Sequence, residues 1–218
     1  MNIPTLQQCL KLFDQYQVPG TVKAHCLAVH NTASFLAQQL VAKGYPLQLS
    51  IVQAFSLLHD FMKAVVLERL TDPPYNYVPT LQETQIHQQL RKKYAGMSET
   101  KVAYLILKEK YPEFAQLFME LDELTRDPRA QVHEETRFIH YIDWRVLGNK
   151  VVPLSERIAY IYERYGFWIR KKNIDWEATK QEQQDYETKI FKYLPFTPAE
   201  LGKNIPSKEN IQSKESKA

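Results

Sequence analysis

Apolar residues recur every three or four positions along most of this chain, and no other feature constrains the possible fold more strongly. In the segment that ends near Lys43, for example, Val22, Val29 and Leu36 fall on one face of a helix. Glycine is scarce, with 6 residues in 218, which disfavours a β-rich fold with many tight turns. The spacing therefore predicts an all-α protein whose helices are joined by short connections.

Prolines, glycines and capping residues mark the ends of eight or nine expected helices. Gly44 stands where a helix C-cap is expected, and Pro112 stands at the first turn of another helix. The chain is long enough for one well-buried core. The helices are expected over about residues 5–16, 20–43, 47–60, 80–93, 98–110, 112–126, 133–147, 154–171 and 176–193.

Two segments are expected to lie outside the helices. Residues 71–79 contain prolines and turn-forming residues, and they form either a lid over a site or a turn packed by its own tyrosines. Residues 202–218 are polar and rich in Lys, Ser and Glu, so we expect a disordered tail. A single helical domain then covers residues 1–201.

The charge and hydropathy of the chain exclude several kinds of partner. The net charge is only +3, and the two short basic runs, 91–93 and 170–172, are expected to be solvated helix ends. No apolar run reaches the roughly 18–20 residues of a membrane span, and the N-terminus does not resemble a signal peptide. We therefore expect a cytoplasmic protein with neither a nucleic-acid nor a membrane partner. Cys9 and Cys26 are expected to be buried and unpaired.

Four polar residues occupy positions where the spacing calls for apolar side chains. His25 lies on the inward face of its predicted helix, and Asp143 does the same in a later helix. His59 and Asp60 end the apolar run 55–58. Burying an ionised carboxylate costs free energy unless a cation or hydrogen-bond donors compensate it. Two carboxylates and two imidazoles on inward faces therefore predict a bound divalent cation.

This set of ligands implies a particular chemistry. Two nitrogen and two oxygen ligands suit Mn, Fe, Co, Ni or Zn better than Ca, and the expected divalent ion is one of these or Mg. In an octahedral site they leave positions open for water and substrate, which distinguishes a catalytic site from a structural one. Lys63 lies one helical turn beyond His59, where it could hold a phosphate oxygen. The expected reaction is hydrolysis of a phosphate ester by metal-activated water.

Each of these residues also has an ordinary structural interpretation. An inward histidine is more often a hydrogen-bonded core residue than a ligand, and a His-Asp pair occurs by chance in many sequences. Arg145 is close enough in sequence to neutralise Asp143. Helical spacing alone does not bring the helices together. A helical scaffold without a metal therefore remains an alternative.

Three segments resemble the motifs of the HD superfamily of metal-dependent phosphohydrolases. Residues 22–29 contain the first His, residues 54–63 an apolar run into His-Asp, and residues 138–146 the distant Asp. Residues 151–157 also resemble the helix that commonly comes next, and the likeness covers about residues 18–166. It implies an HD-type helical bundle that acts on a nucleotide or another small phosphorylated molecule.

The resemblance also implies roles for individual residues. Lys63 matches the lysine that often follows His-Asp and faces the substrate phosphate, and Arg145 stands where the last motif often has a basic residue. Asp60 or Asp143 could take the proton from the attacking water. The implied ligands of a single divalent metal ion are His25, His59, Asp60 and Asp143.

The chain departs from the family's pattern in its middle segment, where related proteins often have histidines that support a second metal. His87 is the only histidine between His59 and His133, and we expect it at the surface or near the substrate. His133 and His140 are expected to be structural, and His30 solvated. The missing histidines leave open an alternative in which the protein is a regulatory module that binds a nucleotide with little or no turnover.

Overall fold

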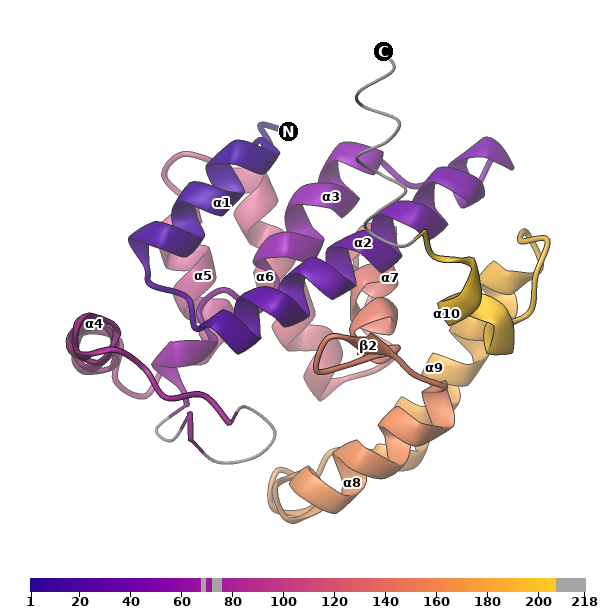
Figure 1. Ribbon diagram of the computed structural model, residues 1–218. Coiled ribbons are helices and arrows are strands. Elements are labelled where there is room, and N and C mark those ends of the chain that lie inside the picture. Colours follow the sequence, from indigo (N-terminus) through magenta and orange to yellow (C-terminus); the bar gives the residue numbers. More distant parts are fainter. Residues whose placement is uncertain (68–69, 72–75, 207–218) are drawn as a thin grey trace.

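The computed structural model describes residues 1–67, 70–71 and 76–206, and in these residues the predicted all-α fold is confirmed. The chain forms a helical bundle with one two-stranded antiparallel hairpin and two short 3-10 helices (Figure 1). The elements are α1 (Leu6–Gln15), α2 (Gly20–Ala42), α3 (Leu49–Leu58), η1 (Lys63–Val65), α4 (Leu81–Lys93), α5 (Glu99–Leu107), α6 (Pro112–Arg126), α7 (Glu134–Asp143), β1 (Val146–Leu147), β2 (Lys150–Val151), α8 (Leu154–Lys171), α9 (Trp176–Phe191), η2 (Pro198–Glu200) and α10 (Leu201–Asn204).

Helix α2 crosses the middle of the bundle and packs against both α3 and α7 (Figure 1). The apolar stripe predicted for this helix is buried, including Val22, Val29 and Leu36. Because α3 and α7 also contact each other, the three helices enclose a common core. This packing decides where the polar residues on their inner faces meet.

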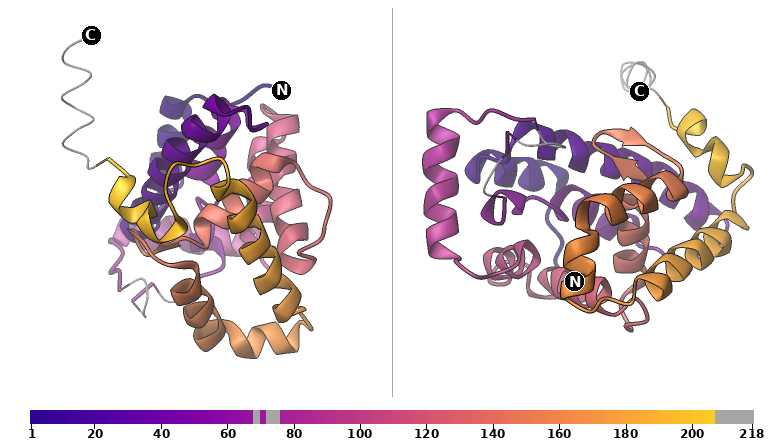
Figure 2. Two further views of the ribbon diagram at one scale, coloured as in Figure 1. Left: turned by 90° about the vertical axis from the view of Figure 1, so that its right-hand side faces the viewer. Right: turned by 90° about the horizontal axis from the view of Figure 1, so that it is seen from below.

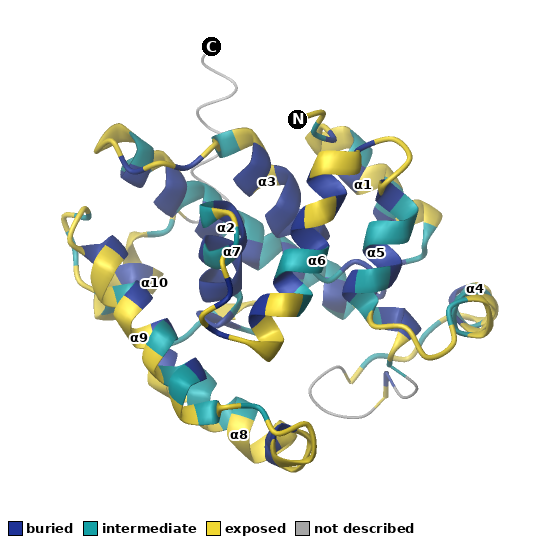
Figure 3. Ribbon diagram, turned by 180° about the vertical axis from the view of Figure 1, so that it is seen from behind, coloured by how far each residue is buried: buried dark blue, intermediate teal, exposed yellow. Residues whose placement is uncertain are grey.

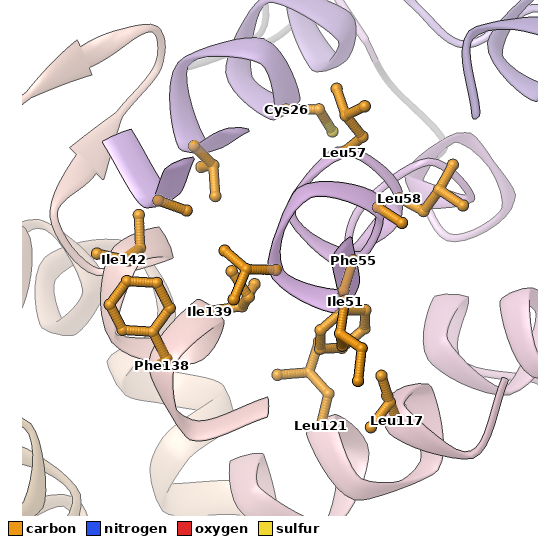
Figure 4. Close-up of a cluster of buried hydrophobic side chains, with 14 of the residues drawn as sticks. Cys26, Ile51, Phe55, Leu57, Leu58, Leu117, Leu121, Phe138, Ile139 and Ile142 are labelled. Carbon is orange, nitrogen blue, oxygen red and sulfur yellow. The ribbon is translucent and has the colours of Figure 1, made fainter. Parts of the chain in front are cut away.

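The sides of α2 and α6 that face this core are buried and their outer sides are more exposed, whereas α8 is exposed over most of its length (Figure 3). Ile51 and Phe55 of α3 point toward Leu117 and Leu121 of α6 (Figure 4). The ring of Phe55 meets that of Phe118 edge to face, with 5.0 Å between the ring centroids. Aromatic packing therefore fixes α3 against α6, on the opposite side from α2.

Both cysteines are buried and unpaired, as predicted. Within the described ranges, no helix has the combination of length and hydrophobicity that crossing a bilayer requires.

Two helix ends differ from the prediction. Helix α7 stops at Asp143 instead of continuing to about residue 147, because the chain turns at Gly148, with φ of 60°, and pairs β1 with β2. At the other end, residues 202–204 belong to helix α10 rather than to a disordered tail. Leu201 is fully buried, and a Cβ added at Gly202 would lie 3.8 Å from the side chain of Val151, so α10 lies close to the hairpin. The rest of the predicted tail, 207–218, lies outside the described residues.

The segment predicted as a lid or a turn is only partly described, since residues 72–75 lie outside the described part of the chain. Tyr77 donates a hydrogen bond from its hydroxyl to Glu83 Oε1 (2.5 Å). Its ring lies against Gly20, where an added Cβ would come within 3.2 Å of a ring carbon. This tyrosine therefore packs between the starts of α2 and α4.

Helix α4 begins with a reciprocal capping box. Thr80 Oγ1 accepts a hydrogen bond from the backbone N–H of Glu83 (3.2 Å), and Glu83 Oε2 accepts one from the backbone N–H of Thr80 (2.7 Å). We expect Thr80→Ala to lower the free energy of unfolding by about 1 kcal/mol, measured by urea denaturation. The exposed Gln85→Ala in the same helix is the control, and an equal loss in both variants would contradict a capping role for Thr80.

Candidate metal centre

The three core helices carry the four predicted ligands toward the same region. His25 lies on the inner stripe of α2, and Asp143 is the last residue of α7. Helix α3 ends at Leu58, so His59 stands at its C-cap and Asp60 follows directly. An apolar helix that ends beneath α2 therefore carries two polar side chains into the core.

The ligand atoms of the cluster are close together. The distance from His25 Nε2 to Asp143 Oδ1 is 2.9 Å, and that from His59 Nε2 to the same oxygen is 3.8 Å. Asp60 Oδ2 lies 4.0 Å from both imidazole Nε2 atoms. Ligand atoms of His25, His59 and Asp143 all lie within 4.8 Å of one another, so the three residues could hold a metal ion. The structure thus brings three of the four predicted ligands into one group, and the fourth, Asp60, lies beside two of them.

Backbone carbonyls orient both imidazole rings. The Nδ1 atom of His25 lies 2.7 Å from the carbonyl oxygen of Gly148, and that of His59 lies 2.8 Å from the carbonyl oxygen of Ser56. A carbonyl can only accept, so each Nδ1 carries the proton and donates it. In a neutral ring the Nε2 lone pair is then available, and both Nε2 atoms face the carboxylates. This arrangement is the usual one for metal-binding histidines.

One atom of the cluster needs a partner. His59 Nε2 is buried and has no hydrogen-bond partner among the described residues. A buried polar atom without a partner costs free energy, and a lone pair without a donor is what a metal ion would satisfy. Likewise His25 would have to carry protons on both nitrogens to bond its two acceptors, whereas a cation between Nε2 and Asp143 removes that need. The residues present therefore fit a divalent ion.

The electrostatic surroundings keep both carboxylates ionised. Burial raises the pKa of Asp143, but the neighbouring His25 and His59 and the charge of Arg157 outweigh burial and hold this pKa well below its usual range. Burial also raises the pKa of Asp60, and the neighbouring Lys63 and His59 more than offset this, so the pKa is lowered. Two anionic ligands are thus available inside the core.

Lys63 is positioned by two carboxylates. Its Nζ lies 3.3 Å from Asp60 Oδ1 and 2.6 Å from Glu99 Oε1 at the start of α5. Burial raises the pKa of Glu99, and the charge of Lys63 opposes that effect only in part. Lys63 therefore lies beside Asp60, the fourth predicted ligand, with its side chain held between two carboxylates.

The structure gives Arg145 a different role from the predicted one. Its side chain is buried, its Nε donates to the carbonyl oxygen of Val152, and its Nη2 donates to that of Pro198. Its Nη1 donates to the hydroxyl of Tyr141 and to Glu187. No contact in the described part of the chain joins it to the cluster. We therefore correct the catalytic assignment of Arg145 to a structural one.

Arg157 of α8 approaches the cluster instead. Its Nη2 lies 3.8 Å from Asp143 Oδ1, and its Nε is buried without a hydrogen-bond partner among the described residues. The sequence reasoning missed both Arg157 and Glu99. Arg157 lies at the end of the family-like segment 151–157, which is the only signal that could have identified it.

The remaining histidines lie away from the cluster's contacts. His87 is buried rather than at the surface, with Nε2 2.7 Å from the carbonyl oxygen of Gln17. His30 is not solvated as predicted, because its Nδ1 lies 3.0 Å from the carbonyl oxygen of Gln53 and burial lowers its pKa. His133, which precedes α7, contacts Glu120 of α6 through its imidazole. The structural roles expected of His133 and His140 agree with their contacts, and His140 packs against Trp144.

Buried His140 makes the stability of the fold depend on pH. Gln183 Nε2 lies 3.0 Å from its Nδ1, and burial lowers the pKa of His140 from 6.5 to about 4. Between these pH values the unfolded chain binds a proton that the folded protein does not, so stability falls as the pH falls. We expect a loss of up to roughly 3 kcal/mol from this residue between pH 7 and pH 4.

Urea denaturation of the wild type and of His140→Asn at several pH values would measure this contribution. Asn keeps an acceptor for Gln183 but does not titrate, so its stability should fall less between pH 6.5 and pH 4. Parallel pH profiles for the two proteins would contradict the assignment.

We compared the chain with protein-family models, with curated proteins and with solved structures, and none of the three comparisons gave a significant match.

Proposed function

We propose that this protein is a metal-dependent phosphohydrolase that cleaves a phosphate ester of a nucleotide or another small molecule. The observation that carries the proposal is the convergence of two imidazoles and two carboxylates, with a buried, unpartnered Nε2 on His59. Such a cluster is costly as a metal-free core and is well suited to a divalent ion. The resemblance of the His, His-Asp and Asp motifs to the HD superfamily supports the same reaction class.

The residues in and around the cluster would have different roles in this reaction. His25, His59, Asp60 and Asp143 would hold the ion, which when bound supplies polarisation of a phosphoryl oxygen and a lowered pKa for a water molecule. Lys63 and Arg157 flank the two carboxylates and would hold the charged phosphate oxygens. Asp60 would accept a proton from the attacking water. The ester and water give an alcohol and a phosphate.

The test is hydrolysis by the purified protein after loading with Mn, Fe, Co, Ni, Zn or Mg in turn. The substrates are p-nitrophenyl phosphate, its diester and nucleoside monophosphates. We expect turnover with at least one metal, lost on addition of a chelator and restored by the metal. Absence of turnover with every metal, in protein shown to contain one equivalent, would contradict the proposal.

A second candidate is a nucleotide-binding module with little or no turnover. The observation that favours it is the pairing of Lys63 with both Asp60 and Glu99. The two carboxylates already neutralise the positive charge that Lys63 would otherwise offer to a substrate phosphate. This candidate predicts saturable nucleotide binding by the metal-loaded protein in calorimetry, without release of phosphate. Binding that is followed by hydrolysis would exclude it.

A further inference from the structure

One face of helix α8 alternates basic and aromatic residues. At about 100° per residue, six side chains fall within a sector about 100° wide. We call this face the α8 stripe, and its members are Arg157, Tyr160, Arg164, Phe167, Trp168 and Lys171. The acidic residues of α8, Glu156 and Glu163, fall outside this sector. The stripe is therefore positively charged and aromatic.

The stripe faces away from the neighbouring helix. The side of α8 that meets α9 carries Tyr162, whose ring stacks on Trp176 with centroids 5.8 Å apart, and the buried Ile169. Phe167 and Trp168 are 63% and 50% exposed, although apolar rings of this size are normally buried. Figure 2 shows α8 and α9 as a pair of helices at the margin of the bundle. The outer part of the stripe is thus open to solvent.

The basic side chains of the outer stripe are available to an anion. Among the described residues, no carboxylate forms an ion pair with Arg164 or Lys171. Their described partners are aromatic rings: Arg164 lies 5.8 Å from the ring centroid of Tyr165, and Lys171 lies 4.8 Å from that of Trp168. Cations held over rings offer both a charge for phosphates and a flat surface for stacking.

The inner end of the stripe reaches the candidate metal centre. Arg157 Nη2 lies 3.8 Å from Asp143 Oδ1, and the guanidinium lies 5.4 Å from the ring centroid of Tyr160. Arg157 Nε and the hydroxyl of Tyr160 are both buried without a hydrogen-bond partner among the described residues. One unpartnered donor therefore lies beside the cluster and a second belongs to the tyrosine next to it, and a phosphate oxygen is an acceptor that suits both.

We infer that the α8 stripe binds a short single-stranded nucleic acid and directs one of its phosphates toward the cluster. Aromatic platforms alternating with cations are how proteins hold single strands, with bases stacked on rings and phosphates on Lys or Arg. From Arg157 to Lys171 the stripe is about 21 Å long, at 1.5 Å per helical residue, which accommodates a few nucleotides. The inference rests on the proposed function, because it names a class of substrate for the same site. It also replaces the expectation from the sequence that the protein has no nucleic-acid partner.

An anionic membrane is the competing occupant, because exposed Trp168 and Phe167 beside Lys171 also suit a lipid surface. A membrane contact would use only the outer end of α8. It gives no role to Arg157, which lies beside Asp143, or to the partly buried Tyr160 next to Arg157. The continuity of the stripe with the cluster favours the nucleic acid.

The test is fluorescence anisotropy with a labelled oligodeoxythymidylate of about ten nucleotides, at low salt and with a chelator, so that no hydrolysis occurs. We expect the double variant Arg164→Ser/Trp168→Ala to weaken binding at least about tenfold. Arg170→Ser is the matched control, because it removes an exposed cation of α8 outside the stripe, and its affinity should stay within about twofold of the wild type. Both altered proteins are checked by thermal unfolding, and the mutated residues are exposed.

Three results would overturn the inference: no binding by the wild type, equal weakening in the double variant and in Arg170→Ser, or an unchanged affinity in the double variant. Sedimentation with vesicles of phosphatidylserine and phosphatidylcholine is the parallel measurement. Vesicle binding lost in the double variant, with unchanged oligonucleotide binding, would assign the stripe to a membrane. Hydrolysis of p-nitrophenyl phosphate by the metal-loaded wild type tests the proposed function by itself, so either idea can fail alone.

Discussion

His59→Asn should abolish metal binding while leaving the fold intact, and this is the largest effect on function that we expect. The imidazole of His59 is held by a hydrogen bond from Nδ1 to the carbonyl oxygen of Ser56, and its Nε2 faces the cluster. The amide group of Asn reaches about as far as Nδ1, so it can still donate to Ser56. It has no atom at the position of Nε2, so the metal would lose one of its two nitrogen ligands.

Removing a residue that only hydrogen-bonds a metal ligand typically lowers metal affinity roughly 10–100-fold. Removing the ligand itself, as in His59→Asn, should lower the affinity by more than this. Hydrolysis should fall to the background rate. Isothermal titration calorimetry with the metal that supports turnover measures the affinity, and the increase in unfolding temperature on metal addition should disappear with it. The control is His133→Asn, since His133 is exposed and contacts only Glu120 among its described side-chain partners. Equal metal affinity in the wild type and His59→Asn would contradict the assignment.

Arg145→Met should cause the largest loss of stability. The guanidinium is buried, pairs with Glu187 and donates a hydrogen bond to the hydroxyl of Tyr141. It also donates to the carbonyl oxygens of Val152, after the hairpin, and Pro198, in the C-terminal region. Removing one partner of a buried ion pair leaves the other charge without compensation, which costs about 3–5 kcal/mol. For a chain of this size that loss lowers the unfolding temperature by roughly 10 °C.

The control for Arg145 is Arg126→Met, because Arg126 is exposed and its pair with Asp122 should contribute little. Thermal unfolding followed by circular dichroism compares the two variants with the wild type. At a temperature where Arg145→Met is folded, it should still bind metal. A variant with wild-type stability but no activity would instead restore Arg145 to the catalytic residues.

The helices could be predicted from the sequence because local and tertiary requirements agree in them. In α2 the spacing of Val22, Val29 and Leu36 matches the buried face, and Gly44 follows where the chain leaves the helix. The hairpin and α10 were missed because each is too short to carry a periodic pattern. The hairpin pairs Val146 with Val151 across a turn at Gly148, and α10 has four residues, of which Leu201 is fully buried.

The candidate ligands could be predicted because each is a polar residue on an otherwise apolar face. Burying a carboxylate or an imidazole at such a position costs free energy unless something compensates it, and one bound cation would compensate all four residues. The basic residues could not be assigned in this way, because long charged side chains reach in directions that spacing does not fix. Arg145 follows the end of α7 and its side chain lies against Glu187, while Arg157 reaches Asp143 from α8.

The most direct test of the metal centre is elemental analysis of protein purified without chelators, for the wild type and His59→Asn, before and after reconstitution with Mn, Fe, Co, Ni or Zn. We predict about one equivalent of a divalent metal in the wild type and almost none in the variant. No metal bound by the wild type under any of these conditions would contradict the metal centre and leave a helical scaffold with a polar core.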